Sequence, residues 1–233
     1  MDTDPAMDNI FQTACSGQIR MTSARLPGGL YAITDVHLIP LGELIDRVAA
    51  AIRGGAAIIQ YRDKSSSHEE RRQQATALAL LCHDHDIPLI INDDVELAAI
   101  VGASGVHLGK ADGSVQVARE ALGASAIIGV SCYNVLERAV EAASEGADYV
   151  AFGRFFPSQS KPDAVTADPE LLARARQCLQ VPIVAIGGIT PENGQALVTA
   201  GAHWLAAIHG VFGQADIEAA ARRYAKLFTQ YQE

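Results

Sequence analysis

The chain of 233 residues lacks the features that would place it in a membrane or around a structural metal. It has no apolar run approaching the roughly 20 residues needed to cross a bilayer. Its cysteines, Cys15, Cys82, Cys132 and Cys178, include no Cys-x-x-Cys pair and no cluster with histidine. Isolated thiols of this kind are typical of a reducing compartment. We expect a cytoplasmic protein that makes no membrane contact and has neither a disulfide framework nor a zinc site.

Positive charge is also scarce, because 27 Asp and Glu residues outnumber 18 Lys and Arg residues and give a formal net charge of −9. This balance argues against binding to nucleic acid or to an anionic membrane. The chain has only four lysines, and Lys64, Lys110 and Lys161 each follow a segment that is predicted below to be a strand. Their placement indicates binding at one site rather than general solubility.

Residues 1–27 begin with acidic side chains and lack the apolar core of a secretory signal. We expect them to be a disordered or tag-like extension outside the fold. The remaining residues, 28–233, are predicted to form one catalytic domain.

A repeated pattern organises this domain. A Gly-Ala step recurs at Gly55, Gly102, Gly146 and Gly201, and each time it ends a helical pattern and precedes a short apolar strand. A further apolar strand lies between each of these pairs, and the segment "LYAITD" comes first. The pattern therefore predicts eight strands that alternate with amphipathic helices.

Strict alternation of strands and helices favours an α/β protein with a parallel sheet. Eight such units in about 200 residues suit a single (β/α)8 TIM barrel with parallel strands. The alternative is an open doubly wound sheet, which would carry a glycine-rich turn after its first strand. The sequence "ITDVHLIP" at that place is not such a turn.

Active sites of (β/α)8 barrels lie at the carboxyl ends of the strands. At the end of the second predicted strand, in "IIQYRDK", Gln60, Arg62 and Lys64 occupy every second position and so share one face. Because a barrel strand has no solvated face, we expect these side chains at the barrel rim to bind an anion, with phosphate oxygens as the natural partners of Arg and Lys.

Two carboxylates follow the next two strands. Asp93 lies in "INDD" beside Asn92, and Asp112 ends "HLGKAD". Mg²⁺ takes one or two carboxylates together with substrate oxygens, so this pair predicts a magnesium site next to a diphosphate. Asp94 is expected to cap the following helix, and a capping or turn role is an open alternative for Asp112 as well. His107 is expected to be a packed histidine of the fourth strand, and a proton shuttle is the alternative.

A second anion site is indicated by Gly188, by the end of the eighth strand in "LAAIHGVF", and by the "SQSK" loop at residues 158–161. Barrels often bind phosphate with the loops after strands 7 and 8. An ordinary glycine turn and an ordinary polar loop remain the alternatives for these segments. Two anion sites suit two phosphorylated substrates or one bisphosphate.

The motifs "QYRDK", "NDD", "HLGKAD", "GVS", "GRFFPSQSKP" and "AIGGI" resemble, in order and spacing, those of the thiamin-phosphate synthase family. The resemblance extends over residues 30–213. It implies a transferase of thiamin biosynthesis that couples 4-amino-2-methyl-5-hydroxymethylpyrimidine diphosphate with hydroxyethylthiazole phosphate, releasing diphosphate by a dissociative mechanism.

The resemblance also implies a role for each matching residue. The pyrimidine diphosphate would be bound by Gln60, Arg62, Lys64, Asn92, Ser131 and Lys161. Of these, the catalytic residues would be Arg62, Lys64, Ser131 and Lys161. The thiazole phosphate would be bound by Ser158, Gln159, Ser160, Gly188, Ile208 and His209. Asp93 and Asp112 would bind Mg²⁺.

This sequence departs from the family pattern at a few positions. Ser158 and Ser160 stand where threonine is usual, Lys110 stands where glutamine is usual, and His209 stands where serine is usual. A contact made by the backbone amide tolerates His209, whereas a contact made by a serine hydroxyl would be lost.

Two other functions remain open at this point. A thiazole tautomerase shares the fold but releases no diphosphate, and a non-catalytic barrel would bind phosphorylated ligands without turnover. Magnesium dependence separates these functions from the synthase. The partners are expected to be phosphorylated small molecules, and an assembly of identical subunits is left open.

Overall fold

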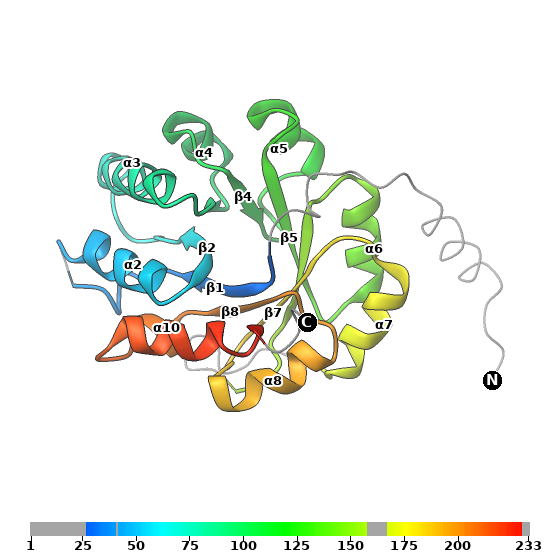
Figure 1. The fold of residues 1–233 in the computed structure, drawn as a ribbon. Coiled ribbons are helices and arrows are strands. Elements are labelled where there is room, and N and C mark those ends of the chain that lie inside the picture. The colour runs from blue at the N-terminus through cyan, green and yellow to red at the C-terminus, as the bar shows by residue number, and fades with distance from the viewer. Residues whose placement is uncertain (1–26, 41, 158–166, 230–233) are drawn as a thin grey trace, which may run out of the picture.

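The protein is a closed barrel of eight parallel strands in sequence order, surrounded by helices (Figure 1). Its structure is a computed structural model that describes residues 27–40, 42–157 and 167–229. The strands are β1 (Gly29–Ile33), β2 (Ala56–Tyr61), β3 (Leu89–Asn92), β4 (Gly105–Leu108), β5 (Ile127–Tyr133), β6 (Tyr149–Gly153), β7 (Ile183–Ile186) and β8 (Trp204–Ala207). The predicted (β/α)8 barrel is confirmed, and the doubly wound sheet is excluded.

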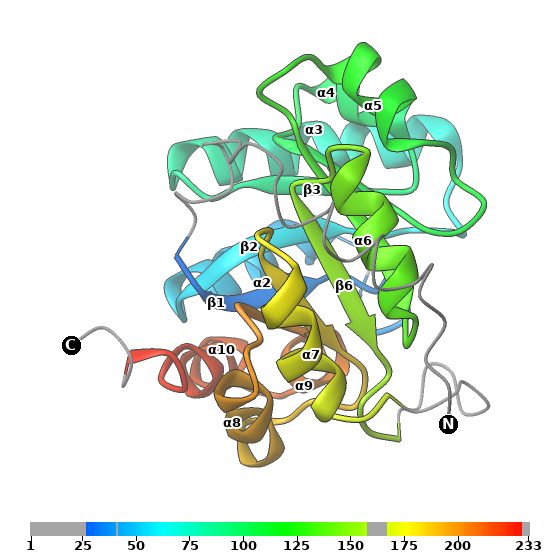
Figure 2. The same ribbon diagram turned by 90° about the vertical axis from the view of Figure 1, so that its right-hand side faces the viewer.

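The helices lie outside the barrel, and Figure 2 shows α6, α7 and α8 following one another along one side. They are α2 (Leu44–Arg53), α3 (His68–Asp84), α4 (Val95–Val101), α5 (Val115–Leu122), α6 (Leu136–Ser144), α7 (Glu170–Cys178), α8 (Pro191–Thr199), α9 (His209–Phe212) and α10 (Ile217–Ala225). No helix within the described ranges is both long and apolar enough to span a bilayer.

Polar residues just beyond the strands begin several of these helices. Ser67 and Glu70 form a capping box at α3, Asp94 accepts a hydrogen bond from the amide of Leu97 at α4, and Ser114 caps α5. The predicted cap at Asp94 is confirmed. Because Ser114 caps α5, Asp112 is not the capping residue of that helix.

The sheet closes where the first strand meets the last. Gly29 pairs with Trp204 and Ala32 with Ala207 across this seam, in parallel register. At the amino-terminal end of the barrel the indole Nε1–H of Trp204 donates to the carbonyl of Pro27. The domain boundary predicted near residue 27 stays a prediction, because the described residues begin there.

Two apolar layers form the core. The larger lies between the strands and the helices, and the smaller fills the barrel, where Tyr31, Ile58, Tyr149 and Trp204 are fully buried. Gly129 makes room for this inner layer, because a Cβ atom there would lie 1.9 Å from Cζ of Tyr149.

The predicted eighth strand was too long. The strand ends at Ala207, and residues His209–Phe212 form the short helix α9 instead. The chain turns at Ile208, whose carbonyl accepts hydrogen bonds from the amides of Val211 and Phe212. Gly210 lets Tyr224 pack against this helix, because the hydroxyl of Tyr224 lies 2.0 Å from the position that a Cβ atom would occupy.

Candidate active site

The carboxyl end of β2 carries its three polar side chains at two depths. Gln60 is 3% exposed, lies inside the barrel and donates from Nε2 to the hydroxyl of Tyr31 at 2.8 Å. Arg62 and Lys64 lie beyond the strand, where the amide of Arg62 donates to Oγ1 of Thr34. Gln60 therefore lies deeper than the rim position expected of it, whereas Arg62 and Lys64 lie at the rim.

Lys64 is held beside the two carboxylates that the sequence singled out. Its Nζ lies 2.7 Å from Oδ2 of Asp93. Asp93 follows β3 in the left-handed backbone region, with φ of 65°, and its amide donates to the carbonyl of His107. Asp112 approaches from the loop after β4, where its Oδ2 accepts from the amide of Gly109 at 2.8 Å. The prediction that these strand ends bring Asp93 and Asp112 together is confirmed.

The two carboxyl groups affect each other's ionisation. Burial alone would raise the pKa of Asp93, but the hydrogen bonds of its carboxyl group with Lys64 and Asp112 outweigh that effect and lower the pKa. Burial raises the pKa of Asp112, and its contact with Asp93 raises it further. Two carboxyl groups in contact titrate as a coupled pair. A bound cation would favour the ionised form of both carboxyl groups.

This donor set fits Mg²⁺. Asp93 and Asp112 offer carboxylate oxygens, which are hard ligands, and Asn92 lies next to them in the same pocket. No group of three or more His, Cys, Asp and Glu side chains suited to a metal occurs in the described part of the chain. One or two carboxylates are the usual protein ligands of an Mg²⁺ ion that also takes substrate oxygens and water.

A pocket of about 550 Å³ opens beside this cluster. Its lining includes Asp63, Lys64, Arg71, Asn92, Asp93, Asp94 and Asp112. Arg71 of α3 lines the pocket although it was not identified from the sequence. Its Nη1 lies 3.3 Å from Oδ2 of Asp94. Its position in the first turn of α3, which starts at the barrel rim, could have indicated that Arg71 lies near the site.

Ser131 lies near the end of β5, where His107 of β4 holds it. Nε2 of His107 lies 2.8 Å from Oγ of Ser131, and Nδ1 lies 2.9 Å from the hydroxyl of Tyr149. Burial lowers the pKa of His107 to about 4, so the ring is neutral at pH 7. The prediction that His107 is a packed histidine is confirmed.

Arg138 of α6 was not found from the sequence. Its Nε donates to the carbonyl of Ser131 at 2.8 Å, and its Nη2 lies 3.4 Å from the carbonyl of Gly109. Its guanidinium carbon lies 5.8 Å from the centre of the Tyr133 ring. Arg138 thus joins the end of β5 to the loop that carries Asp112, a role that only the fold reveals.

The ends of β7 and β8 present backbone rather than charge. Gly188 has φ of 62°, and a Cβ atom there would lie 2.3 Å from the carbonyl oxygen of Pro157. Within the described ranges, the amides of Gly188, Ile208 and His209 donate to no protein acceptor. These amides are therefore available to an anionic ligand.

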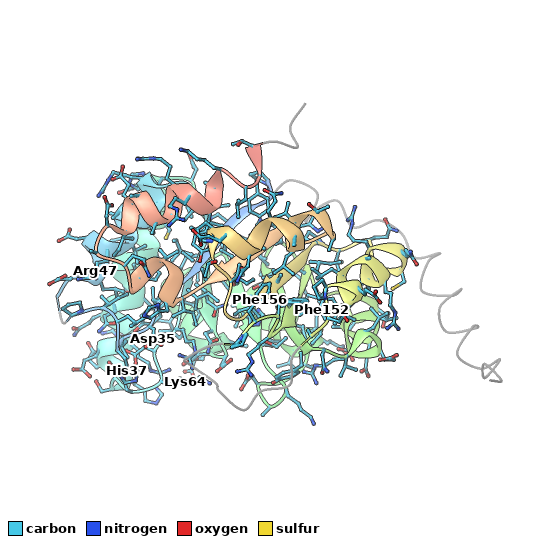
Figure 3. The ribbon with its side chains drawn as sticks, turned by 90° about the horizontal axis from the view of Figure 1, so that it is seen from below. Asp35, His37, Arg47, Lys64, Phe152 and Phe156 are labelled. Atoms are coloured by element: carbon cyan, nitrogen blue, oxygen red, sulfur yellow. The ribbon has the colours of Figure 1, made fainter. Side chains whose placement is uncertain are left out.

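The two predicted anion sites lie on different parts of the rim. In Figure 3 the side chains of Asp35 and Lys64 lie on one side, away from Phe156 of the segment after β6. Nη1 of Arg62 lies 4.0 Å from Oδ2 of Asp35, which places Arg62 with the first group. Ser158, Gln159, Ser160 and Lys161 lie outside the described residues, so their roles stay predictions.

The chain is similar to known proteins over most of its length. Residues 30–211 match the family model "Thiamine monophosphate synthase". The thiamine-phosphate synthase of Nitrosococcus oceani is 54% identical over 203 residues, which cover 87% of this chain and 94% of that protein. The one of Acidithiobacillus ferrooxidans is 49% identical over 211 residues, covering 89% of this chain and 97% of that protein.

A solved structure is also similar to this chain over most of its length. The thiamine phosphate pyrophosphorylase of Pyrococcus furiosus superimposes with a TM-score of 0.80 and 33% sequence identity. The superposition covers 90% of this chain and the whole of that one.

Proposed function

The chain belongs to the thiamine monophosphate synthase family, and from this premise we propose how its site works. The protein is a transferase that joins 4-amino-2-methyl-5-hydroxymethylpyrimidine diphosphate to hydroxyethylthiazole phosphate and releases diphosphate. The observation that carries this assignment to the site is the cluster of Lys64, Asp93 and Asp112 in the rim pocket. A charged cluster of this composition suits a diphosphate leaving group.

The diphosphate is bound at the ends of β2 to β4. Arg62 offers a planar fork of donors and Lys64 a mobile ammonium group, and both suit phosphate oxygens. Lys64 is 60% exposed at its side chain, so it can turn from Asp93 toward a ligand. Asn92 offers its amide from the end of β3. Lys161, which the sequence assigns to the same ligand, completes this set in the proposal.

Asp93 and Asp112 hold Mg²⁺ in this proposal. When bound, the ion neutralises charge that develops on the departing diphosphate. Lys64 lines the same pocket as the two carboxylates. The same two residues would have no such use in a tautomerase that releases no diphosphate.

The reaction is dissociative in this proposal: the bond between the pyrimidine methylene and diphosphate breaks before the thiazole nitrogen attacks. Protein groups then stabilise the leaving group and position the acceptor, and no protein nucleophile is needed. The thiazole phosphate is bound by the amides of Gly188, Ile208 and His209, together with Ser158, Gln159 and Ser160. Because His209 is assigned through its amide, its side chain does not prevent this contact.

A cytoplasmic location is part of the same proposal. Cys82 and Cys132 are buried free thiols, which supports a reducing compartment.

The experiment that tests this function supplies both substrates to the pure protein, with Mg²⁺ and with EDTA. Thiamin phosphate is measured as its fluorescent oxidation product, and released diphosphate is measured in parallel. We expect both products in equal amounts, with Mg²⁺ only. Binding of both ligands without either product would instead favour the non-catalytic barrel, and equal turnover in EDTA would remove the metal from the proposal.

A further inference from the structure

Five polar side chains from five strands form one continuous chain of hydrogen bonds through the barrel interior. Nε2 of Gln60 lies 2.8 Å from the Tyr31 hydroxyl, which lies 2.8 Å from the Tyr149 hydroxyl. Tyr149 reaches Nδ1 of His107 at 2.9 Å, and Nε2 of His107 reaches Ser131 at 2.8 Å. Gln60 and Ser131 are the two ends of this chain, which we call the interior chain.

Each inner member of the interior chain has one hydrogen to donate. A tyrosine hydroxyl carries one hydrogen, and a neutral imidazole carries one N–H and one acceptor nitrogen. Burial raises the pKa values of both tyrosines, so they keep their hydrogens at neutral pH. The direction of a single hydrogen bond therefore determines the direction of all the others.

Gln60 determines that direction. Its Nε2 can only donate, so the Tyr31 oxygen accepts and its hydrogen is directed to Tyr149. The Tyr149 hydrogen is then directed to Nδ1 of His107, and the Nε2–H of His107 is directed to Ser131. In the opposite direction the buried Tyr31 hydroxyl would accept from both neighbours and keep a hydrogen without a partner, which is costly.

Both ends of the interior chain retain a group for a ligand. Oε1 of Gln60 accepts no hydrogen bond from the described residues. It is also absent from the fully buried polar atoms that lack a partner, which are Nε of Arg119 and Nε of Arg154. Oε1 is thus accessible. Ser131 is only partly buried, and since it accepts from His107, its own hydroxyl hydrogen is available.

We propose that Tyr31, Tyr149 and His107 are positioning residues. Through the interior chain they fix Gln60 as the acceptor and Ser131 as the donor toward the pyrimidine ring, a ligand to which the family resemblance already assigns Gln60 and Ser131. The matching ligand is a ring with a hydrogen-bond donor and a ring-nitrogen acceptor, as in an aminopyrimidine. This inference rests on the proposed function, which brings such a ring to the site. An oxo-pyrimidine, which offers a carbonyl and a ring N–H, has the opposite pattern and is rejected.

The tautomer of His107 tests the direction without catalysis. Nitrogen-15 NMR distinguishes the protonated from the unprotonated ring nitrogen, and the His107 signals among the seven histidines are assigned as those missing in H107Q. We expect the Nε2–H tautomer in the unmodified protein, free of ligand. An Nδ1–H tautomer or a charged ring at pH 7 would overturn the proposal, whatever the variants do.

A variant at the far end then tests the coupling. In Q60E, at a pH at which carbon-13 NMR shows the introduced carboxyl ionised, the new group can only accept. We expect the interior chain to reverse and His107 to become the Nδ1–H tautomer, although Gln60 and His107 are separated by two tyrosines. Y149F removes one hydroxyl and is the matched control, since Q60E/Y149F should then give the tautomer of Y149F alone. An unchanged tautomer in folded Q60E contradicts the coupling.

Ligand preference tests the consequence. We expect the protein to bind the 4-amino pyrimidine diphosphate at least about 10-fold more tightly than its 4-oxo analogue. Q60E should weaken this preference, because the reversed chain removes the donor at Ser131 while the acceptor at position 60 remains. Equal affinity of the unmodified protein for both would overturn the inference. Binding with the expected preference, but without thiamin phosphate as product, would overturn the proposed function and leave the recognition intact.

Discussion

The rim cluster and the interior chain are both polar, but they are built on opposite principles. At the rim, Lys64, Asp93 and Asp112 are charged and partly exposed, and each can exchange its protein partner for a ligand or an ion. In the interior, Tyr31, Tyr149 and His107 are neutral and buried, with every partner supplied by the protein. The interior is therefore complete before a substrate arrives, whereas the rim is completed by the charge that the substrate brings.

The largest expected effect is at the rim. D93N removes one charge and keeps the side-chain shape, and asparagine tolerates the left-handed backbone at this position. We expect turnover to fall about 100- to 1,000-fold, with a melting temperature close to that of the unmodified protein. Turnover and thermal unfolding are measured on the same preparation. A variant with normal turnover would show that the carboxylate pair does not assist the departing diphosphate.

In the interior, the expected effect is a pH dependence of the free energy of unfolding. The pKa of His107 is lowered from 6.5 to about 4 by burial, so the unfolded chain binds a proton in this range and the folded chain does not. The free energy of unfolding should therefore decrease as the pH falls from about 6.5 to about 4, by on the order of 3 kcal/mol. Urea titrations across this range measure it.

His203 has its pKa lowered over the same range, by burial and then by Arg176, and so provides a comparison. H107Q and H203Q should each remove part of the pH dependence. A pH dependence that H107Q leaves intact would place its origin outside the barrel interior.

Next in size is the effect of removing the rim guanidinium. R62A should leave folding intact and raise KM for the pyrimidine diphosphate about 10- to 100-fold, because a charge-assisted contact with a phosphate oxygen is lost. R62K keeps the positive charge but not the planar fork of donors, so its KM should lie between that of the unmodified protein and that of R62A. An unchanged KM in steady-state assays would mean that the diphosphate lies elsewhere.

The smallest effect concerns a residue that contacts both regions. Arg138 binds the carbonyl of Ser131 at one end and lies near the carbonyl of Gly109, which precedes the loop to Asp112. R138K should raise the Mg²⁺ concentration for half-maximal activity a few-fold, equivalent to about 1 kcal/mol. R47K is the matched control. Arg47 of α2 forms an exposed ion pair with Glu43, and its replacement should leave the Mg²⁺ concentration for half-maximal activity unchanged.

The contrast also explains what the sequence could predict. Arg62, Lys64, Asp93 and Asp112 were found because charged side chains directly after apolar strands are conspicuous, and a parallel barrel brings such positions to one rim. Their pairing followed from strand order alone.

The interior chain could not be found in this way. Tyr31 and Tyr149 lie within apolar strands, where their rings appear as ordinary core, and nothing local shows that their hydroxyls meet across the barrel. Arg71 was missed because its neighbours in α3 are solvated. The short helix α9 was taken for strand because Val211 and Phe212 continue the apolar pattern. For the interior chain and for Arg71 the deciding contact is distant in sequence.

The seam between β1 and β8 has a consequence for the order of folding. Every other neighbouring pair of strands is joined by a single crossover, whereas Gly29 and Trp204 come from opposite ends of the described chain. Closing so long a loop costs more chain entropy than forming any other strand pair. The last unit to dock should thus be the one that supplies the amides of Ile208 and His209, so an incomplete barrel exposes two strand edges and lacks one side of its rim.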